Sequence, residues 1–270
     1  MISNSNNIIK VLSSNNETYN NSTPLDQFDI RDYLILDAPI LGNLHISLTN
    51  MALYISISFI ILIILLSNSN KISKFFYTGW RLFKECVFDT ICNIVTNQIN
   101  KYNGQLYLPF IFTLFIFILI NNLIGLIPYS FSTTSHFLLT FSWSFTIVLG
   151  TVVLGAYLHK LNFLSLFVPQ GCPLPLLPLL VIIESISFIA RNVSLGLRLA
   201  ANVLAGHMLL VILSGFTLKI FQSGWLGLTG ILPLLFIIAF SFLEFGIAFI
   251  QAQVFIVLSS GYIKDAKDLH

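Results

Sequence analysis

The sequence predicts an all-α integral membrane protein with about five membrane-embedded helices and one interfacial amphipathic helix. Its last two helices are expected to be long, strongly tilted and joined as a hairpin. Of the 270 residues, 56% are hydrophobic and only 9% are charged. The mean hydropathy is +0.87, well above that of soluble domains. Several apolar stretches are also long enough to cross a bilayer core of about 30 Å.

Two parts precede the first span. Residues 1–22 are rich in Asn and Ser and lack the basic start and apolar core of a secretory signal. We expect a disordered tail there that processing could remove, followed by a single membrane domain over residues 23–270. From Thr23 to Asn50, four aspartates stand against a single Arg31. This stretch is expected to be an acidic, partly structured approach to the membrane.

The first span is expected at 51–67, and extending it back to Leu48 gives about 19 residues, enough to cross. Residues 71–100 differ, because apolar side chains recur at helical spacing while charged ones occupy other faces. That pattern is typical of an interfacial amphipathic helix bracing the membrane surface. Its apolar positions are Ile72, Phe75, Phe76, Trp80, Phe83, Val87, Ile91 and Ile94.

Two further spans are expected at 108–127 and 137–158, joined as a hairpin by an uncharged, serine-containing loop. Asn121 and Asn122 lie inside the first of these spans. An amide in hydrocarbon bonds to a neighbouring helix or lines a water path, and both roles remain open for these two residues.

A long apolar helix is expected at 174–216. About 40 residues extend about 60 Å as a helix, twice the bilayer core, so this helix must tilt steeply or break. Its polar side chains fall within about 40° of one line along the helix, and they are Glu184, Ser187, Arg191, Ser194, Arg198 and Asn202. An Arg at the bilayer centre costs about 2.5–3.5 kcal/mol on insertion scales. The stripe should therefore face protein, water or a partner's carboxylate.

A second long helix is expected at 230–263, with Glu244 as its only charge before the terminal Lys-Asp segment. Glu244 and Gln251 share a face, about 20° apart on the helical wheel. Two overlong helices with internal charges favour a tilted pair packed along its polar stripe. Small residues flank Arg198 and would let another backbone approach closely, either within the chain or from a partner. They are Gly196, Ala200, Ala201, Ala205 and Gly206.

Several function classes lack their motifs. The chain has no phosphate-binding loop, no dinucleotide fingerprint, no paired carboxylates at hydrolase spacing and no His/Cys metal cluster. The three cysteines have no metal-ligand spacing, and a net charge of +2 does not favour nucleic acid. We therefore expect no catalytic site of its own, no metal and no cofactor.

Basic residues indicate the orientation. With five spans, one side of the membrane collects Lys71, Lys74, Arg81, Lys84, Lys101, Lys160, Lys264 and Lys267, and the other has only Lys10, Arg31 and Lys219. The positive-inside rule makes the basic side cytoplasmic or matrix and leaves the N-terminus outside. What remains inside the membrane is a series of Glu, Ser, Arg, Asn, His and Gln, which pass protons or hold a counter-charge. A guanidinium does not deprotonate, so an Arg would act as a barrier rather than a relay.

Four segments resemble subunit a of F-type ATP synthases, most of all its mitochondrial, fungal form. The resemblance covers about residues 23 to 270. The segments, in family order, are Ile127-Pro-Tyr-Ser-Phe131, Pro173-Leu-Pro-Leu-Leu-Pro178, Ser194-Leu-Gly-Leu-Arg-Leu-Ala-Ala-Asn202-Val-Leu-Ala-Gly-His207 and Tyr262-Ile-Lys-Asp-Ala-Lys-Asp268.

The resemblance implies a stator subunit beside a rotating ring of c subunits, with other membrane-sector and peripheral-stalk subunits and the lipid bilayer as further partners. It implies a multi-pass protein of the mitochondrial inner membrane, N-terminus in the intermembrane space and C-terminus in the matrix, that translocates H⁺. Arg198 would separate two offset half-channels and attract the deprotonated ring carboxylate.

The remaining site residues follow from the same resemblance. It assigns His207, Glu244, Asn202 and Gln251 to the intermembrane-space path and Glu184 and Asp265 to the matrix path, with Arg191 and Ser194 as further candidates. On an ideal helix His207 points about 180° away from Arg198. One shared path would therefore require helix curvature or a channel between different helices.

Two other classes of function are compatible with the residues alone. A secondary transporter with a mid-membrane substrate site predicts paired broken helices in the two halves of the chain, and no such repeat is visible. A purely structural membrane subunit predicts that the polar stripe only bonds neighbouring helices, so that Arg198 could be exchanged for Gln with little loss of proton flux.

Overall fold

The computed structural model describes residues 25–38, 44–67, 79–99, 101–127, 130–160, 163, 176–222 and 230–267. The tail expected at 1–22 lies outside this part. In chain order the elements are η1 (Asp26–Phe28), β1 (Asp32–Ala38), β2 (Leu44–Thr49), α2 (Asn50–Ser67), α3 (Gly79–Ile99), α4 (Lys101–Gly125), η3 (Thr133–Ser135), α5 (Phe137–His159), α6 (Leu177–Gln222) and α7 (Ile231–Lys267).

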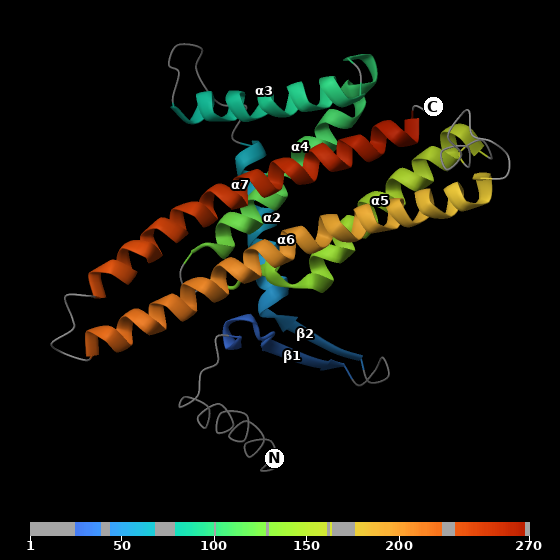
Figure 1. Ribbon diagram of the computed structural model, residues 1–270. Coiled ribbons are helices and arrows are strands. Elements are labelled where there is room, and N and C mark those ends of the chain that lie inside the picture. Colours follow the sequence, from blue (N-terminus) through green and yellow to red (C-terminus); the bar gives the residue numbers. More distant parts are fainter. Residues whose placement is uncertain are drawn as a thin grey trace.

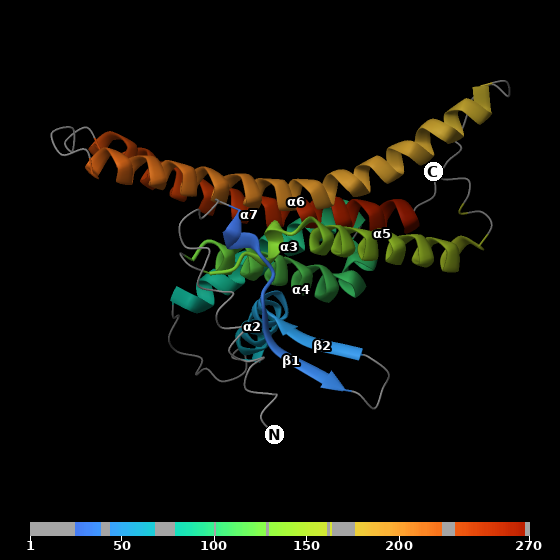
Figure 2. The same ribbon diagram turned by 90° about the horizontal axis from the view of Figure 1, so that it is seen from below.

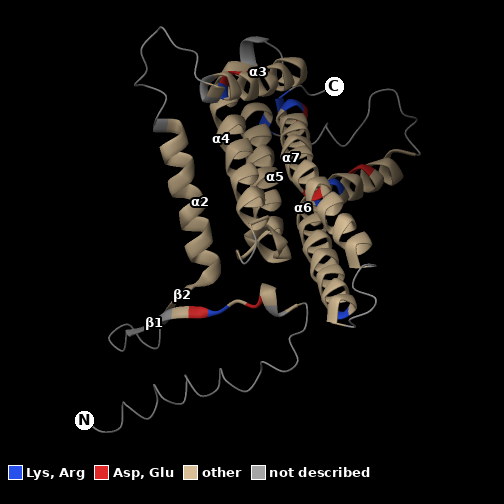
Figure 3. Ribbon diagram, turned by 90° about the vertical axis from the view of Figure 1, so that its left-hand side faces the viewer, with Lys and Arg blue, Asp and Glu red and all other residues tan. Residues whose placement is uncertain are grey.

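Helices α4, from Gly104, α5, α6 and α7 are long and apolar enough to cross a membrane, and α2 is a shorter apolar helix. The all-α membrane fold expected from the sequence is confirmed. Figure 3 shows α2, α4 and α5 running between two ends of the molecule. Helix α3 lies across one end, here called the α3 side, and the β1–β2 hairpin lies at the other, here called the hairpin side.

The hairpin is a feature that the sequence analysis did not specify. Strands β1 and β2 pair antiparallel, with Leu36 opposite Ile46. Because Leu48 belongs to β2, the expected extension of the first span back to Leu48 is wrong. Helix α2 instead begins at Asn50, where the hydroxyl of Thr49 accepts a hydrogen bond from the N–H of Ala52 (3.3 Å), a helix N-cap.

Asn50 also ties the preceding segment to the start of α2. Its side-chain amide donates to the carbonyl of Asp29 (3.0 Å), and its side-chain oxygen accepts from the N–H groups of Met51 (2.8 Å) and Arg31 (3.4 Å). The Asn50 N–H donates to the carbonyl of Arg31 (3.0 Å). The segment from Asp29 to Arg31 is therefore fixed to α2.

Helix α3 is amphipathic, as its sequence pattern indicates, but its buried face differs from the predicted one. Val87, Ile91, Val95 and Ile99 are at most 6% exposed, whereas Phe83 is 47% exposed. The buried positions recur every four residues and pack on α4 and α7. The predicted apolar positions before Gly79 lie outside the described residues, and nothing is described of the Trp80 side chain.

Helices α6 and α7 form the long antiparallel hairpin (Figure 1). Helix α6 has 46 residues, which corresponds to about 69 Å at 1.5 Å per residue. It is continuous and curved rather than broken (Figure 2), so its length is accommodated by tilt. It ends at Gln222, beyond the predicted end at 216, and α7 continues to Lys267, beyond the predicted 263.

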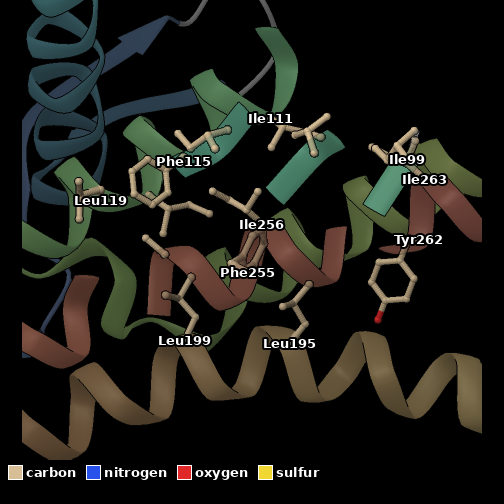
Figure 4. Close-up of a cluster of buried hydrophobic side chains, with 14 of the residues drawn as sticks. Ile99, Ile111, Phe115, Leu119, Leu195, Leu199, Phe255, Ile256, Tyr262 and Ile263 are labelled. Atoms are coloured by element: carbon tan, nitrogen blue, oxygen red, sulfur yellow. The ribbon is translucent and has the colours of Figure 1, made fainter. Parts of the chain in front are cut away.

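The core lies around α7, which contacts α3, α4, α5 and α6. In Figure 4, Leu195 and Leu199 of α6 point toward Phe255 and Ile256 of α7, with Phe115 of α4 beyond them. These five side chains are at most 2% exposed. Since lipid is as apolar as leucine, close packing rather than removal from water stabilises such contacts.

Helices α5 and α6 approach each other closely at Gly196. A Cβ built there would lie 2.9 Å from the Ser144 hydroxyl and 3.3 Å from backbone atoms of α5. We predict that Gly196→Leu separates the two helices and destabilises the protein by about 1–3 kcal/mol, the usual cost of overpacking.

The measurement is the thermal unfolding midpoint of the protein purified in detergent. Gly215→Leu is the control, because a Cβ at Gly215 of the same helix meets no atom within 4 Å. Equal midpoints for the two variants would show that the close approach at Gly196 does not contribute to stability.

Candidate functional site

Three polar contacts follow one another along the seam between α6 and α7. The Arg191 guanidinium lies 3.6 Å from the Asp265 carboxylate. The Asn202 amide donates to the Gln251 side-chain oxygen at 3.1 Å. A Cβ built on Gly206 would overlap the carboxyl group of Glu244. As the residue numbers increase along α6, those of the contacting residues in α7 decrease, as antiparallel packing requires.

The first contact lies toward the α3 side. Arg191 and Asp265 side chains are 42% and 46% exposed, so solvent or a partner can reach both and the pair by itself is weak. Phe188 packs edge-on against Tyr262 beside this pair, with ring centroids 6.1 Å apart. Glu184 is half-buried and lies seven residues before Arg191 on α6, about 10 Å along the axis.

Arg198 is exposed and lies at a groove of about 470 Å³ between three helices. Thr90 and Asn93 of α3 and Gln253 of α7 supply further polar groups to this groove. Sequence reasoning missed them, although Thr90 and Asn93 are three residues apart and therefore share a face of α3.

The predicted polar stripe of α6 faces away from the core of the chain. Leu195, Gly196, Leu199 and Ala200 are buried, while Ser194, Arg198 and Asn202 are exposed. The stripe touches α7 at Arg191 and Asn202. Its remaining surface is open in the isolated chain.

His207 lies in a different environment from Arg198. It is half-buried and points toward the junction of α4 and η3, where a Cβ on Gly125 would lie 3.9 Å from its Nε2 and 3.1 Å from Cβ of Ser132. Phe28 of η1 packs edge-on against the imidazole, with centroids 6.4 Å apart. The side chains of Arg198 and His207 therefore do not lie on one face of α6. A path past His207 would have to run between different helices.

Eight buried polar side-chain atoms have no hydrogen-bond partner within the described part of the chain, and six of them belong to α4, the η3 turn, the second half of α6 and the middle of α7. We call their residues the buried polar cluster: Asn122, Thr134, His136, His207, Glu244 and Gln251. Asn122 is tied to α7 by a 3.4 Å bond from its amide to the carbonyl of Ala248, one turn from both Glu244 and Gln251. Buried polar atoms of this kind usually bond to ordered water.

The η3 turn supplies polar groups that the sequence analysis assigned only to an uncharged loop. Ser132, Thr133, Thr134 and Ser135 are at most 3% exposed. The Thr133 hydroxyl donates to the Asn121 side-chain oxygen at 3.1 Å. Burial lowers the pKa of the neighbouring His136 imidazole, so this ring is mainly neutral at pH 7 and can both donate and accept a hydrogen bond.

The site thus has two separated regions. One contains Arg198, which is exposed and lies at the groove lined by residues of α3 and α7. The other is the buried polar cluster, toward the hairpin side, whose Gln251 bonds to Asn202, one turn from Arg198 on α6. Such an arrangement can hold a fixed positive charge next to a hydrated polar region without direct contact between them.

Comparison with known proteins shows the family to which the chain belongs. Residues 50–264 match the model of the family described as ATP synthase A chain. The chain is 61% identical over 251 residues to ATP synthase subunit a of Podospora anserina, covering 93% of this chain and 95% of the relative. It is 60% identical to that of Neurospora crassa (97% and 100% covered) and 45% identical to that of Saccharomyces cerevisiae (92% and 96% covered). The chain therefore belongs to the ATP synthase A chain family.

Proposed function

We propose that this multi-pass chain is the proton-conducting stator subunit of the membrane sector of ATP synthase. Two offset aqueous half-channels would deliver protons to and from the carboxylates of a rotating c-subunit ring, with Arg198 separating them. Other membrane-sector and peripheral-stalk subunits would complete its surroundings. Membership of the family, with whose named relatives it shares up to 62% identity, supports the assignment to ATP synthase.

The observation that carries the proposal is the exposure of Arg198 on an apolar helix. Arg198 lies near the middle of α6, with exposed Leu197 (39%) beside it. An Arg left against lipid is costly, so intramembrane Arg faces protein or water. An acidic partner surface at this place would cover the charge, and a ring of membrane-buried carboxylates has that chemistry.

Arg198 would act as a barrier because its guanidinium keeps its proton at any physiological pH. Its positive charge favours the ionised form of a carboxylate brought near it. A ring carboxylate would therefore arrive protonated, lose its proton near Arg198, and take up another on the opposite side. The structure supports this role by keeping the buried polar cluster away from Arg198.

The buried polar cluster would form the half-channel on the intermembrane-space side. His207, Glu244, Asn202 and Gln251 are the residues proposed from the sequence, and Asn122 joins them on geometric grounds. Unpartnered oxygen and nitrogen atoms along this region would hold the water that relays protons. Glu244, pressed against Gly206, would be the carboxyl group of this route that lies against α6.

The matrix half-channel is proposed at the α3 side. Glu184 and Asp265 would release protons there, with the Arg191–Asp265 pair holding the end of α7 against α6. Ser194 is a further candidate on the exposed face. The groove that joins Arg198 to Thr90 and Asn93 offers an additional polar route toward the same side.

We infer the orientation from the charges. The N-terminal segment would lie in the intermembrane space and the end of α7 in the matrix of the mitochondrion, because Figure 3 shows basic residues on α3 and at the end of α7, on the α3 side. The translocated ion would be H⁺, with no cofactor. Each proton gains about 2.3 kcal/mol per 100 mV of membrane potential, which would drive rotation.

Replacement of Arg198 tests the central claim. We expect Arg198→Gln to abolish proton-driven ATP synthesis, because the fixed charge that separates the two half-channels is lost. The measurement is potential-driven proton uptake together with ATP synthesis in membrane vesicles.

Arg191→Gln is the matched control on the same helix, since it removes an exposed Arg whose ion pair is weak. It should retain much of the synthesis. Normal synthesis in both variants would mean that the stripe is structural and that the two-channel proposal is wrong.

The contact between Gly206 and Glu244 gives a second test. We expect Gly206→Ala to displace the Glu244 carboxyl group, because the new methyl group would occupy its place. Proton-driven synthesis should fall about tenfold or more, as misplacing a reacting group commonly does.

Assembly of the complex, followed on native gels, should stay close to normal in this variant. Gly215→Ala is the control, since it adds the same methyl group to α6 in open space. If both variants synthesise ATP at the same rate, the position of Glu244 is not important for proton transfer.

A further inference from the structure

A short segment crosses the hairpin side of the bundle before β1 begins (Figure 3). It comprises residues 25–31, including η1, and we call it the N-terminal strap. Phe28 is half-buried, whereas the other described side chains of the strap are exposed, among them the apolar Leu25 (56%) and Ile30 (54%). Phe28 is therefore the side chain by which the strap packs on the bundle.

The ring that Phe28 meets is the imidazole of His207 on α6. The two rings pack edge-on, with centroids 6.4 Å apart and planes at 69° to each other, an arrangement that aromatic pairs favour. The imidazole also lies near the end of α4, where a Cβ on Gly125 would be 3.9 Å from its Nε2. His207 thus lies beside both the strap and α4, which come from distant parts of the sequence.

The contact with Phe28 restricts the imidazole without occupying its Nε2. This nitrogen is buried and has no hydrogen-bond partner among the described residues. A carbonyl or carboxylate bonded to one ring nitrogen would fix the tautomer of the imidazole. Packing against another ring instead limits how the imidazole can turn, and it leaves Nε2 able to bond to ordered water. Such a contact suits a histidine that must take up a proton and pass it on.

Bonds to Asn50 anchor the strap independently of this ring pair. The Asn50 side chain, 5% exposed, donates to the carbonyl of Asp29 and accepts from the N–H of Arg31, at 3.0 and 3.4 Å. Earlier in the strap, the N–H of Phe28 donates to the carbonyl of Leu25 at 2.9 Å and closes the η1 turn. Since Phe28 directly precedes Asp29, these bonds limit where its ring can lie.

We propose that Phe28 is a positioning residue for His207. The anchored strap holds the Phe28 ring against the imidazole and so fixes the orientation in which His207 exchanges protons within the buried polar cluster. The proposal rests on the role of His207 in the proposed proton path and adds the N-terminal strap to it. Proton transfer needs donor and acceptor within hydrogen-bond reach, directly or through one water. An imidazole free to turn would meet this condition less often.

The test uses the intact ATP synthase complex in membrane vesicles. We expect Phe28→Ala to lower proton-driven ATP synthesis about threefold or more, because misplacement of a reacting group slows the reaction. Diethyl pyrocarbonate, which modifies imidazole nitrogens, should react severalfold faster with His207 in this variant, since the covering ring is gone. Modified peptides are quantified by mass spectrometry. His136 is the internal reference, because its ring stacks on Phe131 instead, with centroids 5.1 Å apart.

Three further variants separate positioning from general damage to the strap. Phe28→Tyr keeps the ring and should retain both the synthesis rate and the slow modification of His207. Ile30→Ala shortens an exposed side chain of the same strap and should behave like the native complex. Asn50→Ala removes the side-chain anchor but leaves Phe28 in place, so it should change both readings in the same direction as Phe28→Ala. All rates are taken per assembled complex, measured on native gels.

His207→Gln distinguishes failure of this proposal from failure of the proton path. If His207→Gln is inactive while Phe28→Ala synthesises ATP at the native rate, His207 remains on the path and the positioning role is overturned. A native modification rate at His207 in both Phe28→Ala and Asn50→Ala would likewise show that the strap does not hold the imidazole. Native synthesis in His207→Gln would overturn the proposed path itself, and the positioning role with it.

Discussion

A membrane offers no polar partner to a charged or amide side chain, so each such group inside a span must find one within a protein or in water. The seam between α6 and α7 meets this constraint in two places, where Arg191 lies beside Asp265 and Asn202 bonds to Gln251. Glu244 lies against Gly206, with one carboxyl oxygen unpartnered in the described part of the chain. Because these pairs follow the antiparallel order of the helices, they also determine the register of the hairpin. The position of every other helix on α7 then depends on that register.

The same constraint distinguishes the two faces of α6. Its buried face contains Leu195, Gly196, Leu199 and Ala200, which pack without polar requirements and at close range. Its exposed face holds Arg198, whose charge needs covering. The buried face of α6 is thus fully packed within the chain, whereas the charge of Arg198 on its other face is left uncovered in the isolated chain.

Helical periodicity was enough to predict most helices and the polar stripe of α6, because residues that share a face recur at fixed spacing. It could not predict what each face would meet. Phe83 was predicted as an apolar position of an interfacial helix, and it is exposed in the isolated chain, whereas α4 and α7 bury the line through Val87 and Val95. Similarly, nothing in the spacing of α6 could connect His207 with Gly125 and Phe28, which come from distant parts of the chain.

The β1–β2 hairpin was missed although a signal existed. Pro39, Gly42 and Asn43 separate two short apolar runs, and turn residues between such runs favour a hairpin. The aspartates in this stretch led instead to the interpretation of an acidic approach to the membrane. The η3 turn carries no comparable signal, because serine and threonine in a loop do not reveal that a neighbouring helix will bury them. Its role in the buried polar cluster emerges only from the packing of α4 and α6.

The segment from Leu25 to Arg31 joins two parts of the molecule that are made at very different times. Asn50 ties its end to the start of α2, and Phe28 contacts His207, about two thirds of the chain length away. Contacts between such distant residues form late, after the intervening chain exists. The N-terminal segment must therefore wait through the synthesis and insertion of α3 to α6 before it can dock. Docking of this segment therefore reports that the chain has been made and packed as far as α6.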